Sequence, residues 1–100
     1  MIGTMSGKLT SGRPAESSTV TVVVCAPAGL PGYRAIFEPE GSTRDMAPGD
    51  SVTVEFAGGG PKTIEVYPFE GGLVIWRPLD VPYEDIVVTD QAGNRVEDIY

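Results

Sequence analysis

The chain has 100 residues, a net charge of −7, no histidine and one cysteine, Cys25. This length is enough for one domain that folds without crosslinks, and a single cysteine excludes an internal disulfide. The lack of histidine removes the commonest general base and transition-metal ligand, and the acidic balance argues against a nucleic-acid partner.

Residues 1–18 are rich in glycine, serine and threonine and show no apolar periodicity. We therefore expect a flexible N-terminal arm over 1–18, followed by one domain over 19–100. The arm lacks the continuous apolar stretch of a secretory signal, and no apolar run approaches the length of a membrane span. We expect no membrane partner, and a protein that is cytoplasmic, is part of a virion assembled there, or has already lost a signal.

The first three predicted strands come from β-branched content and alternation. Residues 19–25 predict a strand that ends in Cys25 as a small buried hydrophobe, and residues 33–38 predict a second strand. Residues 51–56 alternate most strictly, which predicts a dry face made of Val52, Val54 and Phe56. Such a strand needs a sheet and a second layer, so the rest of the chain must supply both.

The next two strands are predicted to form a meander with it. After the glycine loop at 57–61, residues 62–69 are expected to return as its partner strand, with Ile64 and Val66 meeting Val52 and Val54. A two-residue turn then leads to a strand over 73–77. Since Pro68 cannot donate a backbone hydrogen bond, we expect an exposed edge or a bulge near it.

A turn at Gly71 and Gly72 places four apolar side chains together on the face opposite the core. This face needs a cover, which is either a part of this chain, such as residues 1–18 or the loop at 80–83, or a partner. Aromatic side chains dominate protein-binding hot spots. The predicted partner-binding residues are Tyr67, Phe69, Val74 and Trp76.

The last predicted unit is a hairpin of strands 86–90 and 94–99 around a three-residue turn, with Gly93 in the left-handed conformation. Its residues 88–94 read Val-Thr-Asp-Gln-Ala-Gly-Asn. They resemble a hairpin near the end of many immunoglobulin-like modules of bacterial and phage surface proteins. The fold that we expect is an antiparallel Ig-like β-sandwich of about seven strands with almost no helix. The resemblance also implies an adhesive or structural role.

No residue pattern points to catalysis, to a cofactor or to a metal. The glycines at 58–60 precede no helix, so they do not form a phosphate loop. Calcium is the one metal that we considered, because two groups of side chains with oxygen ligands lie near the end of the chain. The strand at 86–89 separates these groups by its full length, so they are not expected to share one ion. A solvated acidic surface is the favoured interpretation of these groups, which are Asp80, Glu84 and Asp85 before the strand and Asp90 and Asn94 after it.

We therefore expect a non-enzymatic structural or protein-binding module whose partner is another protein or a second copy. The more specific hypothesis is an accessory subunit of a larger assembly, such as a phage virion decoration or tail-associated protein. The alternative is a small acidic inhibitor, of the immunity type, that masks a basic site on an enzyme. A third is a carbohydrate-binding module that uses Trp76 and Tyr67.

Overall fold

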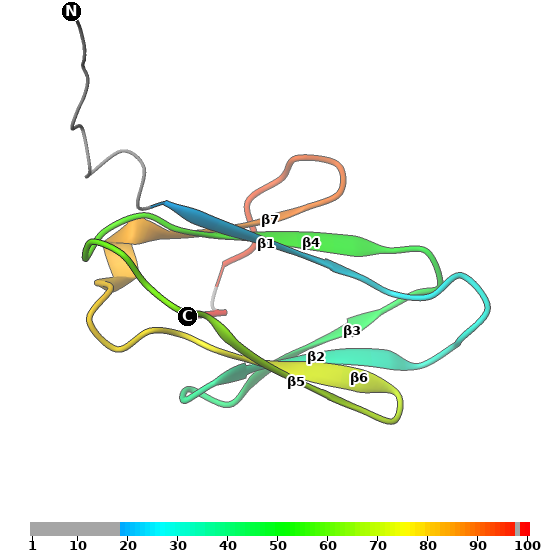
Figure 1. The fold of residues 1–100 in the computed structure, drawn as a ribbon. Coiled ribbons are helices and arrows are strands. Elements are labelled where there is room, and N and C mark those ends of the chain that lie inside the picture. The colour runs from blue at the N-terminus through cyan, green and yellow to red at the C-terminus, as the bar shows by residue number, and fades with distance from the viewer. Residues whose placement is uncertain (1–18, 98) are drawn as a thin grey trace, which may run out of the picture.

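The computed structural model describes residues 19–97, Ile99 and Tyr100, which form two β-sheets packed face to face (Figure 1). The predicted arm at 1–18 lies outside the described residues. The only helix in the described part is one 3-10 turn, η1 (Tyr83–Asp85). The predicted seven-strand sandwich is thus confirmed, with strands β1 (Val20–Cys25), β2 (Tyr33–Glu38), β3 (Ser42–Met46), β4 (Ser51–Phe56), β5 (Glu65–Phe69), β6 (Gly72–Trp76) and β7 (Ile86–Asp90).

One sheet has three strands in the order β1-β4-β7, and the other has four in the order β3-β2-β6-β5. Every pairing is antiparallel except the one between β2 and β6, which is parallel. The parallel β2–β6 pair departs from the wholly antiparallel sandwich that we expected. The immunoglobulin-like assignment stays a prediction.

The predicted pairing of the strand after the glycine loop with β4 is wrong. Strand β4 lies between β1 and β7, with Val54 opposite Val22 on one side and Val88 on the other. Both edges of β4 are therefore occupied, and the chain crosses to the second sheet, where β5 pairs with β6. Ile64 packs against the core from that layer, and Val66 faces Ile75 instead of β4.

The core lies between the sheets, and the predicted dry face of β4 is its centre. Val52, Val54 and Phe56 are each 0% exposed, which confirms the alternation. The ring of Tyr100 lies edge-on to Phe37 at 5.4 Å between centroids and 6.0 Å from Phe56. Its hydroxyl donates a hydrogen bond of 3.0 Å to the carbonyl of Ile75, and burial raises the pKa of Tyr100 above its ordinary value.

Cys25 is exposed, so the prediction of a buried cysteine is wrong. Along β1 the side chains of Val22 and Val24 turn inward, and the alternation then directs Val23 and Cys25 outward. The apolar run alone did not fix which alternate residues face the core. The pairing of Val24 with Val52 decides it.

The predicted three-residue turn at 91–93 is confirmed, with Gly93 at φ 88° and the Asp90 carboxylate accepting hydrogen bonds from the backbone of Ala92 and Asn94. Its second arm, predicted as a strand over 94–99, forms only an isolated bridge between Thr89 and Arg95. The count of seven strands holds because the structure contains a strand that was not predicted, β3, in which only Met46 is buried. Its sequence therefore lacks the apolar alternation that reveals a strand.

Candidate functional site

The candidate site is the outer face of the four-stranded sheet, which we call the aromatic face. Its hairpin turns at Glu70 and Gly71 rather than at Gly71 and Gly72, because Phe69 pairs with Gly72. The observed register differs from the predicted one by two residues, and an even shift leaves every side chain on its predicted face. The aromatic face consists of Tyr67, Phe69, Val74 and Trp76, as predicted, and also Ile36.

The three rings of this face are open to solvent in the described structure. Tyr67 is 52% exposed, Phe69 43% and Trp76 38%. The loop at 80–83 does not cover them, because Val81 enters the core and Tyr83 turns toward Glu40. The other predicted cover, residues 1–18, lies outside the described residues.

Ile36 is a residue of the face that the sequence analysis missed. Strand β2 lies beside β6 in parallel, with Ile36 opposite Val74, which is in turn opposite Tyr67. The half-buried Ile36 therefore extends the apolar surface across a third strand. Its outward direction is readable from the alternation with Ala35 and Phe37, but its place beside Val74 depends on a pairing of distant segments.

Trp76 lies in a row of side chains between two carboxylates. It is opposite Glu65 on β5 and opposite Glu38 on β2. The Tyr67 hydroxyl donates a hydrogen bond of 2.7 Å to Glu65, which orients that carboxylate and raises the pKa of Tyr67. We call these residues, Glu38, Trp76 and Glu65, the Trp76 row.

A hollow of about 240 Å³ opens beside the Trp76 row, where β5 begins and β6 ends. Leu79, which is 73% exposed, forms part of its rim. The hollow thus combines an indole ring and two apolar side chains with a guanidinium and a carboxylate. Its lining residues are Thr63, Glu65, Trp76, Arg77, Pro78 and Leu79.

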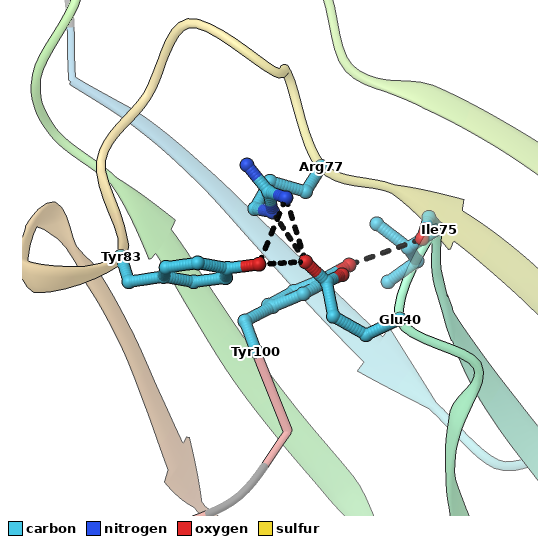
Figure 2. Close-up of polar contacts among 5 residues, drawn as sticks. All are labelled: Glu40, Ile75, Arg77, Tyr83 and Tyr100. Atoms are coloured by element: carbon cyan, nitrogen blue, oxygen red, sulfur yellow. Dashed lines mark hydrogen bonds and ion pairs between the residues drawn. The ribbon is translucent and has the colours of Figure 1, made fainter.

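A polar cluster fixes the chain next to this hollow (Figure 2). Arg77 donates hydrogen bonds of 2.9 Å from Nε and 2.6 Å from Nη2 to Oε2 of Glu40. Tyr83 donates one of 2.6 Å to the same oxygen, and the Arg77 guanidinium stacks 4.5 Å from the centre of its ring. The cluster ties the turn after β2 and the start of η1 to the residue that follows β6.

The electrostatics of this cluster favour its charged state. Burial by itself raises the pKa of Glu40, but the hydrogen bonds from Arg77, from Tyr83 and from its own backbone, with the charge of Arg77, outweigh it and lower the pKa. The hydrogen bond to Glu40 raises the pKa of Arg77, against the effect of burial. The side chains are 10% exposed for Arg77 and 20% for Glu40. This pair is thus better shielded than Arg34 and Asp45, whose side chains are 51% and 73% exposed.

Strand β5 is the edge of its sheet and is exposed on both faces, which confirms the predicted edge at Pro68. Val66 is 40% exposed although it shares the inner face with Ile75, because a sheet of three strands covers one of four incompletely. Opposite residues in an antiparallel ladder alternate between bonded and non-bonded pairs. Counted from the turn-closing pair of Phe69 and Gly72, Pro68 falls in a non-bonded pair and directs its backbone to the open edge.

Among the described residues, no three His, Cys, Asp or Glu side chains gather as metal ligands would. The Asp90 carboxylate, one of the weighed calcium ligands, instead binds backbone N–H groups of its own turn. In the same part of the chain, no helix has the length and apolarity to cross a membrane. Compared with protein-family models, with characterised proteins and with solved structures, the chain matches none.

Proposed function

We propose that the protein is a non-enzymatic module that binds a protein partner through the aromatic face. The observation that carries the proposal is the exposure of Tyr67, Phe69 and Trp76 on the same face of one sheet. Tyrosine and tryptophan provide large, rigid contact area at small entropic cost, and a sheet holds them in fixed positions. An exposed apolar surface of this kind is typical of an interaction site.

The partner would contact the side chains of this face rather than add a strand to its edge. Strand addition uses the free backbone N–H and C=O groups of an edge strand. At the open edge of β5, Pro68 provides no N–H group, and proline is one of the devices that keep edges from pairing. The four-stranded sheet thus offers its outer surface for binding and protects its β5 edge.

The role that we propose for this module is that of an accessory subunit in a larger assembly, such as a phage virion. An acidic inhibitor of a basic enzyme is the second candidate, and it is favoured by the two carboxylates beside Trp76. Both roles use the same face and need no catalytic group. Identification of the captured partner distinguishes them, because the first predicts a capsid or tail protein and the second predicts an enzyme.

Replacement of Trp76 tests the proposed function. Trp76→Ala should leave the melting temperature of the isolated domain within a few degrees of wild type, because the ring lies outside the core. It should abolish capture of a partner from a lysate of the producing organism, since truncation of a hot-spot residue typically costs about 2 kcal/mol or more.

Val23→Ala is the matched control, because Val23 is an exposed apolar residue on the other sheet, at 56% exposure. Supporting evidence is a protein that wild type and Val23→Ala capture and Trp76→Ala does not. If Trp76→Ala unfolds the domain, or if its captured proteins are those of wild type, the aromatic face is not the binding surface.

A further inference from the structure

We propose that the Trp76 row binds an arginine side chain of the protein partner, an inference that rests on the proposed function. The row presents one indole ring between two carboxylates, from three neighbouring strands. Each element of this arrangement has a complement in a guanidinium group. The ring face attracts a cation, and each carboxylate can accept its N–H groups.

The spacing of the row suits such a ligand. Neighbouring strands lie about 4.8 Å apart, so Glu38 and Glu65 each lie one strand away from Trp76, on either side of it and on the same face of the sheet. A guanidinium that stacks on Trp76 then lies within reach of both. The hollow beside the row adds Leu79 and Pro78, against which the apolar stem of an arginine can pack.

The charges of the aromatic face also favour a cation. Arg34, on the same face, is bound to Asp45 at 2.7 Å, and Arg77, in the hollow, is bound to Glu40 at 2.6 Å. The charges of these two arginines are thus neutralised by Asp45 and Glu40. Glu38 and Glu65 are the charged residues opposite Trp76. The net charge of −7 adds a field that attracts a basic partner.

Arginine fits this row better than lysine. Its guanidinium is planar, weakly hydrated and able to stack on a ring while its N–H groups bind in the plane. The protein itself contains this geometry, because Arg77 stacks 4.5 Å from the ring of Tyr83 and donates to Glu40 at the same time. A lysine ammonium is a strongly hydrated point charge and would satisfy only part of the row.

Trp76 is the single tryptophan of the chain, so the indole fluorescence of the full-length protein reports on this row directly. We expect a hexa-arginine peptide at low salt to change this fluorescence saturably. Hexalysine should bind several-fold more weakly. The double variant Glu38→Gln/Glu65→Gln should weaken binding of hexa-arginine about tenfold or more, because it removes both carboxylates and keeps their shape.

The control is Glu55→Gln/Glu84→Gln, which removes the same two charges elsewhere on the surface, because Glu55 is an exposed acid on the outer face of β4 and Glu84 is an exposed acid of η1. It should leave the affinity within twofold of wild type. An equal loss in this control would show attraction to the net charge alone and would overturn the proposal, as would hexalysine binding as tightly as hexa-arginine, or the absence of a saturable change.

A fluorescence change on dilution of the protein without peptide would mean that a second copy occupies the row. This result would also contradict the proposal that the row binds an arginine of a different protein. The outcome is separable from that of the proposed function. If hexa-arginine fails to bind while Trp76→Ala still abolishes partner capture, the aromatic face binds a protein and only the arginine assignment is wrong.

Discussion

Gly72 pairs with Arg34 at a point where β6 has no room for a side chain against β2. A Cβ atom at this position would meet the ring of Phe69 at 2.6 Å and also the backbone carbonyl of Arg34. Since a carbonyl of the neighbouring strand cannot move without disturbing the sheet, we expect Gly72→Ala to lower the free energy of unfolding by about 1–3 kcal/mol. Urea denaturation measures this.

Gly29→Ala is the matched control for that change. A Cβ at Gly29 meets nothing within 4 Å, and Gly29 is not among the residues with positive φ. Its substitution should alter the free energy of unfolding by no more than about 0.5 kcal/mol. Equal destabilisation by the two substitutions would contradict the close packing of β6 on β2.

Glu40 should make the stability of the protein sensitive to acid. Its pKa is lowered in the folded state, so its ion pair contributes fully above the ordinary pKa of glutamate and is lost as the pH falls through the folded value. Glu40→Gln should lower the free energy of unfolding by about 1 kcal/mol at neutral pH. The melting temperatures of wild type and variant should converge as the solution is acidified.

The exposed pair of Arg34 and Asp45 provides the comparison for Glu40. The pKa of Asp45 is also lowered, by the hydrogen bond and then the charge of Arg34, but 73% of its side chain is exposed. Solvent screening makes such pairs weak. Asp45→Asn should therefore change the melting temperature little, and a larger effect than that of Glu40→Gln would contradict the role of the polar cluster.

At the scale of the strands, β4 and β5 should differ most in stability. Strand β4 has neighbours on both sides and three side chains with no exposure, whereas β5 is an edge strand exposed along its whole length. Amide hydrogen exchange of the isolated protein should therefore be slowest in β4 and fastest, among the strands, in β5. Protection of β5 equal to that of β4 would mean that another segment or a second copy covers that edge.

The same contrast explains which strands the sequence could predict. Strand β4 has one face in the core and the other in water, so apolar residues occupy alternate positions in its sequence. These residues are Val52, Val54 and Phe56. Strand β3 buries only Met46 and carries no such pattern, so it was missed. The pairing of the strands is harder to predict than their positions. Several apolar strands could each have paired with β4, and the local sequence does not show that β1 and β7 do so while β5 crosses to the second sheet.

Over the whole molecule, the candidate site was predictable to the extent that it is local. Tyr67, Phe69, Val74 and Trp76 lie on two strands joined by a short turn, and their common face follows from alternation alone. Ile36 and Glu38 reach the same surface only through the parallel pairing of β2 with β6, which joins segments separated by more than thirty residues. No local pattern encodes that neighbour.

Strand β6 has a consequence for how this protein can change over evolutionary time. It sends Leu73 and Ile75 toward the core, while Val74 and Trp76 emerge on the opposite side. Under the proposed function, substitutions at Val74 and Trp76 can alter the binding surface while Leu73 and Ile75 keep their places in the core. The same five residues can therefore vary at their outward positions without loss of the fold.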